Sequence, residues 1–149
     1  METQGGFLIS RIKHLADRVF ERMLKECGID AFNGAQGRIL YVLWQHEELP
    51  IGRIGQLTSL AKTTLTGMLD RMEEAGLIRR MANPGNRRQI LVSITPKMKD
   101  YRDQYEQVSQ KMNRLFYKGF SDEEIARFEV RLKAIIRNLE SEGDDLENG

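Results

Sequence analysis

The chain has 149 residues, of which 40% are apolar and 30% are charged, so it can bury a core beneath a highly charged surface. The sequence holds no run of about 18 apolar residues, no basic and then apolar leader over residues 1–6, and a single cysteine, Cys27; it therefore predicts a cytoplasmic protein without a membrane span, a secretory signal or an internal disulfide. The net charge of +1 hides an asymmetry, because residues 50–102 hold ten basic and four acidic side chains, whereas residues 120–149 hold four and nine.

Two helices are expected in the first third of the chain. The first spans about residues 7–27, where apolar side chains recur at helical spacing, and Gly28 is suited to end it. Its apolar stripe consists of Leu8, Ile12, Leu15, Val19 and Met23, widened by Ala16, Phe20 and Leu24. The second begins at Asn33, which has capping-box spacing to Gln36, and continues to about His46.

A helix-turn-helix pattern follows. A short helix is expected over about residues 53–58, a turn at Ser59 and Leu60, and a second helix over about residues 62–75 that Gly76 ends. The buried face of this second helix is predicted to consist of Leu65, Met68, Leu69 and Met72.

The apolar period then changes from helical to alternating. Strands are expected over residues 77–82 and 89–95, paired as an antiparallel hairpin. Pro84 and Gly85 lie between them in the order that suits a type II turn, so the hairpin should have an exposed, basic tip.

Two more helices complete the expected order. Thr95 and Pro96 can cap and open a long helix that reaches about Lys118. Ser121 and Glu124 form another capping-box pattern, which opens a last helix that ends near residue 139. Residues 140–149 are acidic and nearly free of apolar side chains, so a disordered tail is predicted there. The fold class is mainly α with a small β-hairpin.

The outer face of the helix at residues 62–75 is the first candidate site. A helix-turn-helix places its second helix in the major groove of DNA, where each base pair shows a distinct pattern of donors and acceptors. Short polar side chains allow a close approach to the bases, and threonine methyl groups can contact thymine. The candidate contacts are Lys62, Thr63, Thr64, Thr66, Gly67 and Arg71. The alternative interpretation is an ordinary solvent-exposed helix face.

Arginines at the hairpin form the second candidate site. Arg87 and Arg88, next to Asn86, lie at the predicted tip, where an arginine can enter the minor groove. Arg79 and Arg80 lie on the opposite strand and can contact phosphates. Arginines that protect a strand edge against aggregation are the alternative.

From Ile51 to Thr95 the sequence resembles the MarR family of bacterial winged-helix regulators, named for multiple antibiotic resistance. Two stretches carry the resemblance: LTGMLDRMEEAGLIRR at residues 65–80 and NPGNRRQILVSIT at residues 83–95. The flanking helices match the family layout in order and length, so the resemblance covers essentially the whole chain. Three positions depart from it: Asn86 replaces a usual aspartate, Gly67 a frequent arginine and Ala61 a usual serine.

The resemblance implies one domain over residues 1–149 and a homodimer on a pseudo-palindromic DNA operator. Residues 33–95 would form the winged helix-turn-helix lobe, and helices 7–27 and 96–139 the dimerisation lobe. It also implies repression of nearby genes that a small-molecule effector or oxidation releases. A helical protein-protein interaction module without DNA binding is the alternative function.

Sensing groups are few in this sequence. Family pockets lie between the dimer helices and the winged lobe, which makes His14, Arg18, Tyr41 and Trp44 candidate lining residues. Cys27 lies near the end of its helix, where the helix dipole disfavours a thiolate, so an inert thiol is favoured over a redox sensor. We expect no metal, no cofactor and no catalytic residues, because neither paired ligand spacing nor a nucleophile with an evident base occurs.

Overall fold

The computed structural model describes residues 1–147 and divides the chain into two units, residues 1–112 and residues 113–149. Its elements, in chain order, are α1 (Gly5–Glu26), α2 (Gly34–His46), β1 (Glu48–Pro50), α3 (Ile51–Thr58), α4 (Lys62–Glu74), β2 (Ile78–Asn83), β3 (Asn86–Ile94), α5 (Pro96–Lys99), α6 (Arg102–Phe116) and α7 (Asp122–Glu147). The predicted class, mainly helical with a small hairpin, is confirmed. Over residues 1–147, no helix has the length and apolarity needed to cross a bilayer.

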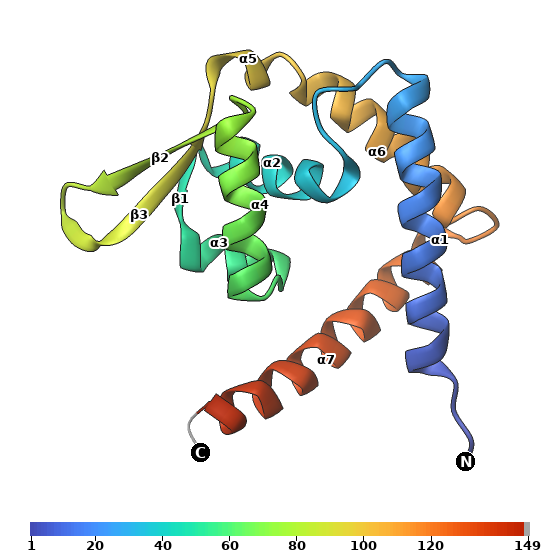
Figure 1. Cartoon of the computed structure of the whole chain (residues 1–149). Coiled ribbons are helices and arrows are strands. Elements are labelled where there is room, and N and C mark those ends of the chain that lie inside the picture. Colours follow the sequence, from blue (N-terminus) through green and yellow to red (C-terminus); the bar gives the residue numbers. More distant parts are fainter. Residues whose placement is uncertain (148–149) are drawn as a thin grey trace. The chain divides into compact units, whose positions relative to one another are not determined.

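The sheet is antiparallel with strand order β1-β3-β2. Leu49 pairs with Val92 and Ile78 pairs with Ile94, so apolar side chains from three strands enter the same core. The β2–β3 hairpin extends beyond β1 as a two-stranded arm, with α3 and α4 packed at its base (Figure 1). This arm is the wing that the alternating pattern predicts.

The core of the first unit joins α2, α3, α4 and the base of the sheet. Its largest fully buried side chains include Leu40, Leu43, Ile54, Leu69 and Met72. Burying each of them stabilises the fold by roughly 1.5–3 kcal/mol relative to exposure. The wing and the helix-turn-helix therefore share one core, which fixes α4 against the base of the hairpin.

Most predicted helix ends are confirmed. Asn33 and Gln36 form the capping box of α2, with both hydrogen bonds present at 2.8 and 3.1 Å. Ser121 and Glu124 form the equivalent pair before α7. Gly28 and Gly76 end α1 and α4 with φ of 76° and 77°, a left-handed conformation that glycine adopts without a Cβ clash.

The long helix expected from Pro96 to Lys118 is wrong, because the chain breaks into α5 and α6. The Met98 carbonyl, which would accept from the Arg102 N–H in a continuous helix, instead accepts the Trp44 indole N–H at 3.0 Å. Thr95 also lacks a capping hydrogen bond; its hydroxyl donates to the Gly76 carbonyl at 2.7 Å. At Met98 and at Thr95, a hydrogen bond to another element thus takes the place of the helical hydrogen bond that the local sequence predicts.

Two further expectations are corrected. A type II turn requires a positive φ at its third residue, here Gly85. In the part of the chain that the structure describes, Gly85 does not have a positive φ, so the tip is not a type II turn. The Asn83 side chain accepts from the Gly85 N–H at 3.0 Å, and the hairpin register shifts beside it. The predicted disordered tail over residues 140–149 is instead helical as far as Glu147; residues 148 and 149 lie outside the described residues.

Candidate nucleic-acid interface

Helix α4 has one buried and one exposed face. Leu65, Leu69 and Met72 point into the core and are at most 2% exposed. The predicted contact residues lie on the opposite face; Lys62, Thr63, Thr64, Thr66 and Arg71 are exposed, and Gly67 is half-buried. Helix α4 has no side-chain cap at Ala61, so its first backbone N–H groups remain available to an anion.

The threonines give this face a low profile. The Thr66 hydroxyl donates to the Lys62 carbonyl at 2.8 Å, so it presents its methyl group and its oxygen lone pairs outward. A Cβ at Gly67 would lie 3.6 Å from the nearest Arg71 guanidinium nitrogen, an ordinary contact. The glycine is therefore not required by packing, and its small size leaves the centre of the face open.

Arg80 is placed differently from the other predicted arginines. Its guanidinium pairs with Asp70 at 2.8 Å and with Glu73 at 3.1 Å, and its backbone N–H donates to Glu73 at 3.0 Å. Hydrogen bonds from Arg80 lower the pKa of Glu73 and, reciprocally, Glu73 and Asp70 raise the pKa of Arg80. Arg80 thus ties β2 to α4, a role that the sequence pattern of paired arginines did not reveal.

The wing tip is organised by asparagine side chains. Asn86 accepts from the Arg88 N–H at 3.1 Å, and the Asn83 amide donates to Gln89 at 3.0 Å. Asn86 thus braces the tip through a hydrogen bond, as its neutral side chain permits. Arg79, Arg87 and Arg88 are exposed, so their guanidinium groups can reach a ligand.

A hollow of about 1000 Å³ lies between α3, α4 and the wing. Arg53, Lys62 and Arg88 contribute positive charge to its lining, and Thr66 contributes a hydroxyl. The candidate residues of α4 and of the wing therefore meet around one concave, basic surface. A polyanion is the chemical class that this surface favours.

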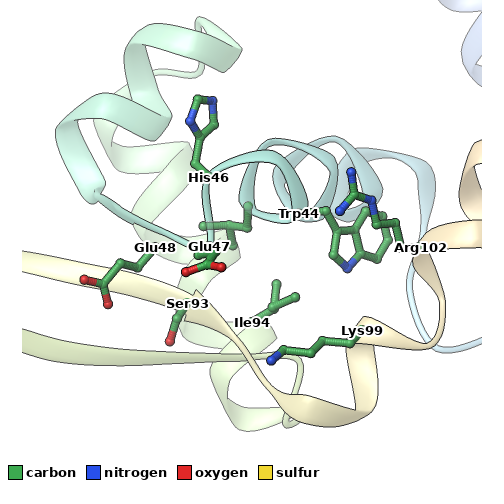
Figure 2. A pocket seen from close by; sticks show the side chains of 9 residues that line it. Trp44, His46, Glu47, Glu48, Ser93, Ile94, Lys99 and Arg102 are labelled. Carbon is green, nitrogen blue, oxygen red and sulfur yellow. The ribbon is translucent and has the colours of Figure 1, made fainter.

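The four predicted effector residues lie in different surroundings. Trp44 is core, at 7% exposure, while His14 and Arg18 lie exposed on α1 and Tyr41 packs against Tyr105 with ring centroids 6.2 Å apart. Of these four residues, only Trp44 lines the cavity at the end of α2 that Figure 2 shows. Its charged wall residues were missed, since they come from β1, α5, α6 and the residue after α2, and they follow no local period.

Comparisons with known proteins agree with the fold. Residues 32–90 match the sequence model of the MarR family. The organic hydroperoxide resistance transcriptional regulator of Bacillus subtilis (strain 168) is 43% identical over 95 residues, which cover 64% of this chain and 63% of that relative, less than two thirds of its length. The multiple antibiotic resistance protein MarR of Escherichia coli (strain K12) is 27% identical over 88% of this chain and 90% of its own.

Solved structures show the same architecture. A mutant MarR from E. coli, complexed with operator DNA, matches with a TM-score of 0.77 and 27% identity, covering 87% of this chain and 91% of that one. An uncharacterized SlyA-like transcription regulator from Listeria monocytogenes matches with a TM-score of 0.83 at 20% identity, covering 95% and 92%.

Proposed function

We propose that this chain is a transcriptional regulator of the MarR family that binds double-stranded DNA as a homodimer. The observation that carries the proposal is the exposed, threonine-rich face of α4 beside a wing with three exposed arginines. A helix of this kind fits the major groove, and wing arginines reach phosphates or the minor groove at its flank.

The division of roles follows from side-chain position. Thr63, Thr64 and Thr66 read base edges, and Lys62 and Arg71 contact phosphates. Arg87 and Arg88 contact the flank of the site. Arg80 keeps α4 and the wing in register through Asp70 and Glu73. A helical protein-interaction module would require neither the groove-facing threonines nor the basic tip.

The homodimer is supported by apolar side chains that the single chain leaves exposed. On α1 these are Phe7, Leu8, Ile9, Ile12 and Leu15, each at least 41% exposed. On α7 they are Val130, Ile135, Ile136 and Leu139, each at least 43% exposed. Contiguous exposed apolar faces of this kind mark protein interfaces. A two-fold dimer reads a pseudo-palindrome whose half-site centres lie about 10 bp apart, or a multiple of that.

Repression in the cytoplasm, relieved by a small effector, completes the proposal. The Bacillus subtilis relative is a transcriptional regulator by name, which supports a non-enzymatic role. The experiment is selection of bound fragments from the source genome, followed by titration of the selected operator at several salt concentrations. We expect a pseudo-palindromic site and a steep loss of affinity with salt. Equal affinity for random DNA at every salt concentration contradicts sequence-specific regulation.

A further inference from the structure

The cavity at the end of α2 has the size and wall chemistry of a small-molecule site. Its volume is about 600 Å³, within the usual range for such sites, and it is open to solvent, with Glu47, Lys99 and Arg102 exposed. Leu43, Trp44 and Ile94 supply apolar wall, while Glu47, Lys99 and Arg102 supply charge. In Figure 2, Trp44 and Glu47 lie at the end of α2, Ile94 lies on β3, and Lys99 and Arg102 lie on the α5–α6 segment.

Glu47 enters the cavity from an unusual backbone conformation. It has φ 63° and ψ −62°, a region that non-glycine residues rarely occupy. Its N–H still bonds to the Leu43 carbonyl at 2.9 Å, so it ends α2 and turns the chain directly into β1. In Figure 2 the Glu47 carboxylate points toward the middle of the cavity, whereas that of Glu48 points away from the other lining side chains.

The opposite charges in this cavity are not paired with one another. Among the side chains that the structure describes, Glu47 and Lys99 take part in no ion pair within 4.0 Å, and Arg102 pairs with Glu106 at 3.3 Å. A ligand that is only an anion would meet the Glu47 carboxylate, and one that is only a cation would meet the Lys99 ammonium. A ligand that carries both charges can pair with the Glu47 carboxylate and with the Lys99 ammonium.

We infer that this cavity binds a small amphoteric molecule with an apolar body, the chemistry of a free apolar α-amino acid. Its ammonium group bonds to Glu47, its carboxylate bonds to Lys99, and its apolar body lies against Leu43, Trp44 and Ile94. The indole of Trp44 is fixed for this contact, because its N–H is held by the Met98 carbonyl at 3.0 Å. Trp44 is the only tryptophan of the chain, so its fluorescence reports on the cavity directly.

The cavity is linked to the wing through β1 and β3. Glu48 pairs with Ser93 on β3, the strand that continues to the wing tip, and Lys99 lies on α5, which leads into α6. A molecule that bridges Glu47 and Lys99 draws the end of α2 toward α5 and changes how β1 holds β3. This regulatory consequence rests on the proposed DNA-binding function, whereas the binding itself does not.

The first experiment is titration calorimetry of the full chain with L-phenylalanine, with benzoate, which has only the negative charge, and with phenethylamine, which has only the positive charge. Trp44 fluorescence is recorded in parallel. We expect saturable binding of L-phenylalanine at least tenfold tighter than binding of either singly charged compound. Absence of saturable L-phenylalanine binding, or equal binding of benzoate, overturns the assignment.

Variants then locate the site. Glu47→Gln and Lys99→Met should each weaken L-phenylalanine binding at least tenfold and leave the far-ultraviolet circular dichroism unchanged. The matched controls are Glu74→Gln and Lys97→Met, which remove the same charges from exposed side chains that do not line the cavity. If the controls weaken binding as much as the cavity variants, the ligand is not held by Glu47 and Lys99.

Operator titration with and without L-phenylalanine separates the two proposals. A shift of threefold or more in operator affinity, absent in Glu47→Gln, supports regulation through this cavity. Calorimetric binding without any shift overturns the regulatory consequence and leaves the site. Calorimetric binding by a chain that binds no operator at all contradicts the proposed function alone.

Discussion

Arg80 and Arg87 lie on the same hairpin but have different electrostatic surroundings. Arg80 is held by two carboxylates of α4, so its charge is already balanced inside the protein. Arg87 is exposed at the wing tip, and its charge is free to neutralise a phosphate or to enter a narrow minor groove. The two arginines should therefore respond differently when each is removed.

Replacing Arg87 by alanine should weaken operator binding by roughly 1–3 kcal/mol and lower the salt slope by about one unit. The loss should be larger on A·T-rich flanks, where the minor groove is narrow. Fluorescence anisotropy over a salt series, on operators with A·T-rich and G·C-rich flanks, measures both effects. Lys25→Ala, a charge change at the end of α1, serves as the control. Equal affinity of Arg87→Ala and the unmodified chain on both flanks would show that the wing tip does not contact DNA.

Arg80→Met should raise the pKa of Glu73 back toward its ordinary value of 4.5, because the hydrogen bonds from Arg80 hold that pKa down. A carboxylate with a lowered folded pKa contributes stability above its unfolded pKa and loses it as pH falls through the folded pKa. The stability difference between the two proteins should therefore be present at pH 7 and shrink as pH falls below 4.5. Carboxyl chemical shifts measured by NMR across a pH series test this. An unchanged Glu73 titration in Arg80→Met contradicts the ion-pair argument.

At the scale of elements, Thr95 joins the end of α4 to the end of β3. Its hydroxyl donates to the Gly76 carbonyl at 2.7 Å, and its N–H donates to the Leu77 carbonyl at 3.1 Å. Thr95→Val keeps the shape and removes the hydroxyl, so it should destabilise the fold by about 1–2 kcal/mol. Urea unfolding measures the loss. Thr63→Val, on the exposed face of α4, should change stability by less than about 0.5 kcal/mol. A loss in Thr95→Val no larger than in this control would mean that the bond contributes little.

The elements that the sequence predicts well are those with a long local period. The stripe of α4, the strand β3 and the capping boxes before α2 and α7 are all confirmed. Strand β1 was missed, because three residues that include Pro50 show no period and pair only with β3, more than 40 residues later. The break between α5 and α6 was missed for the same reason, since the Trp44 indole that takes the Met98 carbonyl is 54 residues away.

The candidate site divides in the same way. Its exposed α4 face and basic tip follow from local pattern, and the structure leaves those side chains exposed as predicted. The pairing of Arg80 with Asp70 and Glu73 joins two elements, and no spacing rule distinguishes it from Arg79 beside it. The Glu47 and Lys99 wall joins residues 52 positions apart and depends on a rare backbone conformation, which composition does not encode.

At the scale of the whole molecule, the proposed dimer determines whether two recognition helices act on one operator. The N-terminal part of α1 is the surface to test, because Ile12 is 41% exposed while Met23 and Leu24, nearer its end, belong to the core. Deletion of all of α1 would therefore remove core as well as interface. A charge at Ile12 or at Leu139, which is 67% exposed on α7, perturbs the exposed faces alone.

Ile12→Glu and Leu139→Glu should each convert the dimer to a folded monomer, because burying an unpaired carboxylate in an apolar interface costs several kcal/mol. Light scattering after size exclusion gives the mass, and circular dichroism verifies the fold. Operator affinity should fall when dimerisation is lost, since a monomer contacts one half-site and loses the gain that comes from linking two. Ser10→Glu places the same charge on the polar face of α1 and should remain a dimer with unchanged operator affinity. If Ile12→Glu and Leu139→Glu both stay dimeric at low micromolar concentration, α1 and α7 do not form the interface, and the exposed apolar faces need another partner.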